Sequence, residues 1–237
     1  MIRAILFSVL AVPLFFISAP AQAASEEIEA YIQEIEPKVI SWRRDIHEHP
    51  ELGNRETRTA GIVAEHLTAL GLDEVRTGVA HTGVVGVLKG GKPGPVVALR
   101  ADMDALPVTE KTDLPFASKV RTTYRGQDVG VMHACGHDAH TAILMGAAEV
   151  LAKHRDQLAG TVVFLFQPAE EGTPEGEDGG ASMMIREGAL EDPRPEVIFG
   201  LHTWPGPTGM LMVREEGAMA GSDSMKIHIK GSQTHGA

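Results

Sequence analysis

The six residues at positions 161–166, which read TVVFLF, constrain the fold more than any other segment of this chain. A strand with one face in water alternates apolar and polar side chains, whereas this run is apolar on both faces. Such a strand lies in the middle of a sheet and is covered by other elements on each side. The segment therefore predicts a layered core around a buried sheet.

The segments around this strand predict the layers that cover it. Apolar residues at helical spacing predict a first helix that is capped by Ser25, reaches Ile46, and is kinked or split at Pro37. The same spacing predicts three further helices, over residues 57–70 with Gly71 as the cap, 139–151 and 180–187. Short apolar runs predict strands over residues 83–88, 95–99 and 197–201. Strands that alternate with helices indicate an α/β fold, in which helices flank a mostly parallel sheet.

Two further patterns concern how these strands connect. The turn sequence GGKPG separates runs 83–88 and 95–99, which predicts a hairpin or two adjacent strands. Near the end of the chain, residues 224–230 alternate Met225, Ile227 and Ile229 with polar residues, the pattern of a strand with one face in water. This change of pattern predicts that a second, smaller domain begins near Gly221.

Composition excludes several classes of protein. The chain has 21 Lys and Arg against 32 Asp and Glu, a net charge of −11, which argues against a nucleic-acid binder. Its 43% hydrophobic and 22% charged residues exclude a disordered chain. The single cysteine excludes an internal disulfide and a structural zinc site of the Cys₄ or Cys₂His₂ type.

Residues 1–23 have the layout of a secretory signal. One arginine precedes an apolar run that ends in the small-residue sequence Ala21-Gln22-Ala23. A membrane anchor is the alternative, but Pro13 and Pro20 interrupt the run, which is shorter than the roughly 20 apolar residues of a membrane span. We expect cleavage after Ala23 and a secreted or periplasmic mature protein without a membrane span.

Reactive side chains gather just after predicted strands or at the start of a predicted helix. Asp102 and Asp104 follow one strand, Glu170 and Glu171 follow another, and His202 follows a third. A fourth group leads into the helix over 139–151 and consists of Cys135, His137, Asp138 and His140. Because ligands bind outside the carboxyl ends of strands in open α/β sheets, we expect these groups to converge on one crevice.

Each group has an ordinary structural explanation when it is taken alone. Aspartates are common in turns, and a single histidine is more often packed than reactive. Two adjacent carboxylates after an apolar strand must be solvated or neutralised by a cation. Together, four such groups predict a metal site.

A ligand set of cysteine, histidine and glutamate favours zinc, and it also accommodates manganese, cobalt or nickel. A metal ion activates water, and a nearby carboxylate can move the proton to a leaving nitrogen. This chemistry predicts hydrolysis of an amide or ester. Of Glu170 and Glu171, one is expected to bind metal while the other faces substrate, and spacing does not assign the two roles.

Other catalytic motifs are absent from the sequence. Ser182 lies in GGASMM, which lacks the second glycine of a nucleophile elbow. The segment from Gly86 to Lys92 approaches a phosphate loop, but Pro93 occupies the position that needs a hydroxyl. His47 and His49 are spaced wrongly for an H-E-x-x-H motif.

The motifs also carry a resemblance to a known family. The relevant stretches are WRRDIHEHPELGNRETRTA, ALRADMDALPV, MHACGHDAHTAILMGAA, LFQPAEEG, GGASMMIREGAL and GLHTWP. With them the chain resembles the amidohydrolase branch of the aminoacylase/carboxypeptidase-G metallopeptidase superfamily, which includes hippurate hydrolases and auxin-conjugate hydrolases. The resemblance implies a di-metal exopeptidase-like catalytic domain over residues 24–220. It also implies that residues 221–237 hold the first strand of a smaller α+β lid and dimerisation domain.

The resemblance implies an activity and a role for each site residue. The activity is metal-dependent hydrolysis of N-acyl amino acids or short peptides to a carboxylic acid and a free amino acid, in a homodimer with two divalent ions per subunit. By position, the implied metal ligands are Cys135, His137, Glu171 and His202, and Glu170 is the implied general base. Asp104 resembles the residue that steadies the site. His235 resembles the histidine that the smaller domain contributes to the neighbouring subunit's active site.

The sequence departs from the family pattern at its end. Family members continue through the smaller domain and supply one more histidine ligand, whereas this chain ends at Ala237. We therefore expect a C-terminally incomplete amidohydrolase whose activity alone is weak or absent. The alternatives are a metal-dependent dipeptidase or carboxypeptidase, and a non-catalytic fragment that binds metal or peptide.

Overall fold

The structure is a computed structural model that describes residues 19–217, 225 and 227–232. The chain divides into two units, Met1–Thr203 and Trp204–Ala237. The described helices and strands all belong to the first unit. The described residues of the second unit are without helix or strand.

The second unit bears on two expectations. The strand predicted over 224–230 is not formed by the described residues of that segment, so this prediction was wrong for them. Met225, Ile227 and Ile229 are strongly exposed, and a strand is unstable when it neither pairs nor buries an apolar face. The domain start expected near Gly221 lies outside the described residues and stays a prediction.

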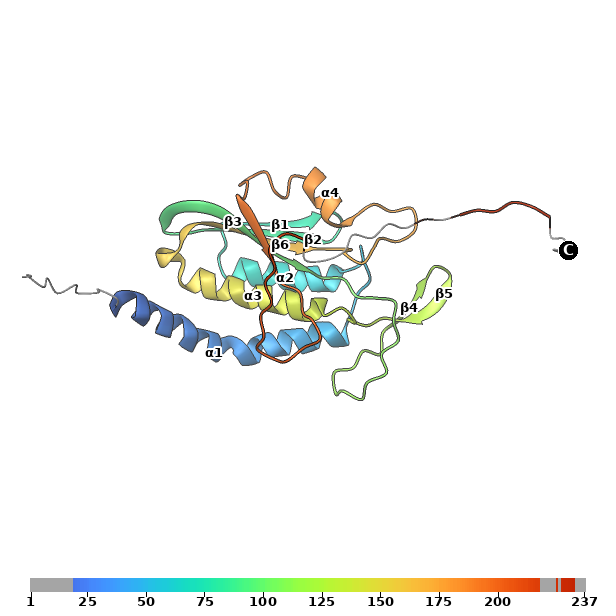
Figure 1. Ribbon diagram of the computed structural model, residues 1–237, viewed down its shortest axis with the longest axis horizontal. Coiled ribbons are helices and arrows are strands. Elements are labelled where there is room, and N and C mark those ends of the chain that lie inside the picture. The colour runs from blue at the N-terminus through green and yellow to red at the C-terminus, as the bar shows by residue number, and fades with distance from the viewer. Residues whose placement is uncertain (1–18, 218–224, 226, 233–237) are drawn as a thin grey trace, which may run out of the picture. The chain divides into compact units, whose positions relative to one another are not determined.

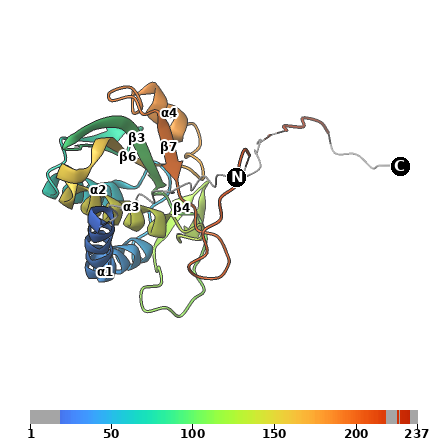
Figure 2. The same ribbon diagram turned by 60° about the vertical axis from the view of Figure 1, so that its left-hand side comes forward.

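The first unit is an α/β domain. Its described helices are α1 (Ala19–Glu48), α2 (Thr57–Ala69), α3 (His137–Lys153), α4 (Gly180–Arg186) and the short 3-10 helix η1 (Arg155–Gln157). Its described strands are β1 (Glu74–Val79), β2 (Gly83–Lys89), β3 (Lys92–Asp102), β4 (Arg121–Tyr124), β5 (Gln127–Gly130), β6 (Ala159–Gln167) and β7 (Val197–Gly200). Helices α1, α2 and α3 lie on one side of the main sheet and α4 lies on the other (Figures 1 and 2).

The main sheet of the described chain has the order β1-β2-β6-β3-β7. Strands β6, β3 and β7 run parallel to one another, and β2 is antiparallel to both β1 and β6. Strand β2 is therefore the one member of this sheet that runs in the opposite direction. The predicted α/β class with a mostly parallel, helix-flanked sheet is confirmed.

Strand β6 is the centre of the core, as the apolar run at 161–166 predicts. Phe164 and Phe166 point into the layer formed with α2 and α3, while Val163 and Leu165 point into the layer beneath α4. All four side chains are buried. In contrast, β7 pairs with β3 alone among the described strands, and Val197, Ile198 and Phe199 are exposed.

The expected pairing of runs 83–88 and 95–99 was wrong. These runs become β2 and β3, and β6 lies between them. The GGKPG turn does not fold back as a hairpin because it passes around the start of β6. There the amides of Gly90 and Lys92 donate to the carbonyls of Gly160 and Leu158, at 2.8 and 3.1 Å. The neighbours of β2 are instead β6 and β1, both antiparallel to it, and the sequence analysis did not identify β1.

The first helix differs from its prediction at two points. Helix α1 begins at Ala19, so Ser25 lies inside it and does not cap it. The alanine-rich sequence before Ser25 favours helix, which explains the earlier start. Pro37 does not split α1, because contacts on both sides of it, from Tyr31 to Glu149 and from Arg43 to Asp138, join α1 to α3. Residues 1–18 of the expected signal lie outside the described residues, so the signal stays a prediction.

Other boundaries agree closely with the sequence. Helix α2 ends at Ala69 with Gly71 in a left-handed conformation, as the predicted cap requires.

The hairpin of β4 and β5 was not predicted, because its strands are short and largely polar. Among the described helices, none is long and apolar enough to cross a membrane.

The close approach of β3 and β6 depends on Gly160. This residue has φ +92°, and a Cβ placed on it would collide with the carbonyl oxygen of Pro95 and lie 2.9 Å from the carbonyl carbon of Gly94. Gly126 also has a positive φ, of +77°, but a Cβ there meets no atom within 4 Å.

We therefore expect Gly160→Ala to reduce the free energy of unfolding by about 3 kcal/mol or more. The backbone of Gly94 and Pro95 must move to admit the new Cβ, and the alanine must adopt a strained φ. Gly126→Ala is the matched control, which carries the φ cost alone, about 1 kcal/mol. Urea unfolding followed by circular dichroism measures both values. Equal losses in the two variants would contradict this account.

Candidate metal centre

The reactive groups converge because of the register of the parallel strands. Strand β3 ends at Asp102 and pairs there with Gln167, the last residue of β6. Glu170 and Glu171 follow β6, and His202 follows β7, the other neighbour of β3. Helix α3 begins at His137 and is fixed to β3 by a 2.8 Å hydrogen bond from the Thr141 hydroxyl to the Asp102 carbonyl. All four groups therefore lie at one edge of the sheet.

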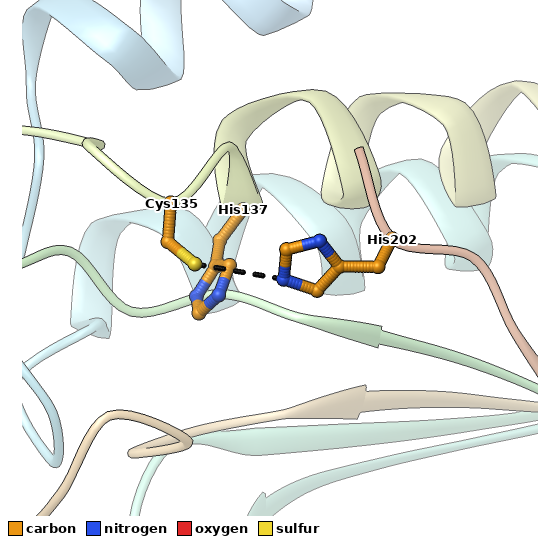
Figure 3. Close-up of side chains that lie close together, drawn as sticks. All are labelled: Cys135, His137 and His202. Carbon is orange, nitrogen blue, oxygen red and sulfur yellow. Dashed lines mark hydrogen bonds between the residues drawn. The ribbon is translucent and has the colours of Figure 1, made fainter. Parts of the chain in front are cut away.

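Cys135, His137 and His202 face one another (Figure 3). The Cys135 Sγ lies 3.5 Å from His202 Nε2, and one ligand atom from each of the three residues lies within 4.8 Å of the others. His202 Nδ1 lies 2.6 Å from its acceptor, the Thr203 carbonyl oxygen, so the proton is placed on Nδ1. The remaining nitrogen, Nε2, then presents its lone pair to Cys135.

His137 gives the clearest sign that this site suits a cation. Its ring is fully buried, its Nδ1 hydrogen bonds to Asp104 Oδ1 at 3.2 Å, and its Nε2 has no hydrogen-bond partner in the described structure. Three carboxylates surround this Nε2, those of Asp102, Glu170 and Glu171, at 3.6, 3.9 and 4.0 Å. A buried polar atom without a partner is costly, whereas a metal ion at this point would satisfy it.

The electrostatics of His137 lead to the same conclusion. Burial lowers the pKa of the imidazole, but the hydrogen bond to Asp104 and the charges of Asp102 and Asp104 outweigh burial and raise the pKa above its ordinary value. The site therefore attracts positive charge at His137 Nε2. A divalent ion supplies that charge without a proton.

Asp104 holds two parts of the centre together. One carboxylate oxygen accepts from His137, and the other accepts from the Glu171 backbone amide at 2.9 Å. Asp104 is fully buried, so these hydrogen bonds are not shared with bulk water. This arrangement agrees with the steadying role that the resemblance implies.

Glu170 and Glu171 both reach the centre. Ala169, the residue before them, has φ +48°, a left-handed conformation that costs an L-residue about 1–3 kcal/mol. Burial and the charges of Asp102 and Glu171 raise the pKa of Glu170, which makes it a stronger proton acceptor than an ordinary glutamate. The Glu171 backbone is fixed by Asp104, whereas the Glu170 side chain is the more exposed of the two.

His140 is a residue of the centre to which the sequence analysis assigned no role. Its Nδ1 donates to Asp102 Oδ1 at 2.6 Å, and its Nε2 accepts from the Thr203 amide at 2.8 Å. Both ring nitrogens are therefore occupied, so His140 is suited to positioning and not to metal binding. It ties the end of β3 to the segment that carries His202. The signal in the sequence was its spacing of three residues from His137 on one helix.

Asp102, the partner of His140, is held ionised. Burial raises the pKa of this carboxyl, but the His140 hydrogen bond and the Arg100 and His137 charges outweigh burial and lower it to about 2. Arg100 Nη1 lies 2.6 Å from Asp102 Oδ2. The sequence analysis treated Asp102 as a turn residue when taken alone, and the structure gives it this charged role.

A second network of polar contacts, around Asp138, joins α1 to the start of α3 next to the centre. His47 Nδ1 lies 2.8 Å from Asp138 Oδ2, and Arg43 Nε lies 2.7 Å from the same oxygen. Both partners of Asp138 come from α1, so the end of α1 is fixed to the first turn of α3 beside His137. His235, the remaining site residue predicted from the sequence, lies outside the described residues.

The fold and the site define an α/β protein with a candidate metal centre at the carboxyl ends of its parallel strands. Comparison with known proteins identifies the family. The chain belongs to peptidase family M20/M25/M40, whose model matches residues 98–229, more than half of the chain. The family resemblance that the motifs predict is thereby confirmed.

The relatives of this chain are about twice its length. It is 46% identical over 214 residues to thermostable carboxypeptidase 1 of Saccharolobus solfataricus, covering 90% of this chain and 51% of the relative. It is 42% identical over 213 residues to an N-acyl-L-amino acid amidohydrolase of Geobacillus stearothermophilus, covering 90% of this chain and 54% of the relative. The chain therefore spans about half the length of the curated relatives it matches.

Solved structures give the same family. The structure is similar to that of the Bacillus subtilis YxeP protein, a dinuclear metal-binding peptidase of the M20 family, with a TM-score of 0.63 and 42% identity. The match covers 73% of this chain and 44% of that chain.

The thiol of Cys135 gives a direct test of the centre. Burial, a hydrogen bond to Glu171 and the nearby carboxylate charges raise the pKa of this thiol to about 12 in the metal-free protein. The thiol is then protonated at neutral pH, and the thiolate is the reactive form.

We expect iodoacetamide to alkylate Cys135 of the metal-free, folded chain at least ~100-fold more slowly at pH 8 than in the urea-unfolded chain, where the thiol pKa is about 8.5. Mass spectrometry after chelator treatment measures both rates. Glu171→Gln removes a charge and should speed the folded-state reaction. Equal rates in the folded and unfolded chains would refute the raised pKa.

Proposed function

We propose that this centre binds two divalent metal ions and hydrolyses the amide bond of N-acyl amino acids. The observation that carries the proposal is the buried, unpartnered Nε2 of His137 among three carboxylates. The relatives named for amidohydrolase activity and the dinuclear metal-binding relative support the same reading.

The residues present fit a metal pair. Cys135, His137, Glu171 and His202 would hold the ions, with zinc the first choice for this donor set and manganese, cobalt or nickel also compatible. When bound, such ions polarise a carbonyl group and make water acidic enough to lose a proton near neutral pH. Asp104 and the Thr203 carbonyl orient the two histidines for this task, by fixing the proton on each Nδ1.

Glu170 would act as the general base. Its carboxylate lies within 4 Å of His137 Nε2, and its raised pKa suits proton transfer near neutral pH. It would accept the proton of the attacking water and deliver it to the leaving nitrogen. The products are a carboxylic acid and a free amino acid.

The surroundings of Glu171 suit a small substrate. A cavity of about 530 Å³ adjoins this residue, between the turn at Pro50–Arg55 and the β4–β5 hairpin. This volume lies within the range of small-molecule sites, about 300–1,000 Å³. Apolar side chains line part of it, including Leu52, Leu106 and Val131, which suits an acyl group.

A metal-dependent carboxypeptidase or dipeptidase is the second candidate. It is favoured by the 46% identity to a relative named thermostable carboxypeptidase. The two candidates share the centre and differ in the group that occupies the cavity.

Further proposals for the whole protein are a homodimer, a contribution of His235 to the neighbouring subunit's site, and export after cleavage at Ala23.

Glu170 separates catalysis from metal binding. We expect Glu170→Gln to retain the zinc content of the wild type and to reduce hydrolysis at least ~100-fold, because general-base catalysis contributes about 10²–10⁴-fold. Release of the amino acid from N-acetyl and N-benzoyl substrates, with dipeptides in parallel, is measured for the chain and for its fusion to the C-terminal half of the Geobacillus relative. Hydrolysis that persists in Glu170→Gln would contradict the base assignment. Zinc binding without hydrolysis in the wild-type fusion would favour a binding protein.

Asp104 tests the metal site itself. We expect Asp104→Asn to weaken zinc affinity about 10–100-fold, because the residue orients a ligand histidine from outside the ligand set. Competition with a chromophoric chelator measures the affinity. Asp128→Asn on exposed β5 is the control and should bind zinc like the wild type. Unchanged affinity in Asp104→Asn would argue against His137 as a ligand.

A further inference from the structure

Glu56 is a fully buried carboxylate that the proposed chemistry does not use. It occupies the position before the first residue of α2, yet its side chain makes no capping hydrogen bond to that helix. Its two oxygens accept instead from two distant neutral donors. Oε1 accepts from the Ala169 backbone amide at 2.8 Å, and Oε2 accepts from the Thr82 hydroxyl at 2.5 Å.

The first of these partners lies directly before the proposed base. Ala169 is the residue with φ +48°, and the chain turns through it from the end of β6 to Glu170 and Glu171. Its backbone amide is buried, so if Glu56 were removed no water molecule could replace it as the acceptor. An unfavourable backbone conformation persists only where its surroundings hold it.

Packing around Ala169 shows that this turn is held from several sides. A Cβ on Gly53 would lie 3.0 Å from the Ala169 Cβ, and a Cβ on Gly180 would lie 3.0 Å from the Ala169 carbonyl oxygen. Gly53 and Glu56 belong to the same segment before α2. That segment therefore contacts the turn through close backbone packing and through one buried carboxylate.

Burying a carboxylate is energetically unfavourable, because burial disfavours the charged form and raises the pKa of Glu56. An apolar side chain would fill the volume without that cost, but it would leave the Ala169 amide and the Thr82 hydroxyl unsatisfied. The chemistry of Glu56 is thus matched to these two donors.

We propose that Glu56 is a positioning residue, which fixes the left-handed turn at Ala169 and thereby aims the carboxylates of Glu170 and Glu171 at the metal centre. The part that concerns catalysis rests on the proposed function, since it takes Glu170 as the base. The part that concerns the turn does not depend on catalysis.

The test compares three variants of the chain by amide hydrogen exchange, read by NMR. The measured quantity is the exchange rate of the Ala169 amide divided by that of the Phe164 amide in the middle of β6. A global loss of stability speeds Phe164 at least as much as Ala169, so it leaves the ratio unchanged or lowers it. Loss of the Glu56 acceptor speeds Ala169 and raises the ratio.

We expect Glu56→Ala to raise this ratio at least tenfold. Glu56→Gln should keep it near the wild-type value, because the amide oxygen still accepts from Ala169 and the amide nitrogen donates to Thr82. Glu149→Ala is the matched control, since Glu149 is a buried carboxylate near the other end of α3 that pairs with Lys38. It should destabilise the chain without raising the ratio. If Glu56→Ala does not fold, Glu56→Met fills the volume without an acceptor and takes its place.

Hydrolysis by the fusion protein gives the second readout. Glu56→Ala should lower kcat at least tenfold with KM little changed, and Glu56→Gln should restore most of the activity. An unchanged exchange ratio in Glu56→Ala, or an equal rise in Glu149→Ala, would overturn the inference. A raised ratio with no hydrolysis in the wild-type fusion would reject the proposed function and leave the positioning of the turn established.

Discussion

The register between β3 and β6 is the constraint on which the rest of the structure depends. Asp102 pairs with Gln167, so the chain leaves both strands at the same level, and the side chains that follow meet across a short gap. A slip of one residue would turn all the side chains of β3, including Asp102, to the opposite face of the sheet. The glycines at the other end of these strands protect the register, because Gly160 and Gly94 bring the two backbones together where no Cβ fits.

Charge at this edge of the sheet is organised in layers around the histidines. Asp104 orients His137, Asp102 orients His140, and Asp138 links the first turn of α3 to His47 and Arg43. Each of these three carboxylates has a donor on at least one oxygen. His137 Nε2, which has no hydrogen-bond partner in the described structure, lies where the carboxylates of Asp102, Glu170 and Glu171 converge. Because three carboxylates surround this buried ring nitrogen, the centre is suited to take up a cation.

The sequence was sufficient for the layers of the fold and for the convergence of the polar side chains that follow β3, β6 and β7. The two-sided apolar run of β6 required a covered central strand, and polar residues after β3, β6 and β7 had to meet once those strands were parallel. It was insufficient where contacts are non-local. The GGKPG turn has the composition of a hairpin, but β6, more than sixty residues later, inserts between its two strands. The roles of His140 and Glu56 depend on Thr203 and Ala169, and neither pairing leaves a local pattern in the sequence.

The exposed strand β7 has a consequence for how tightly this centre can hold an ion. His202 is delivered by a strand of four residues that is paired along one side in the described chain and has little apolar surface buried. Such an element opens locally at a small free-energy cost, and every opening withdraws His202 from the other proposed ligands. The apparent affinity is then the intrinsic affinity multiplied by the fraction of time that β7 is closed. Any contact that covers β7 would tighten metal binding from a distance, without touching a single ligand.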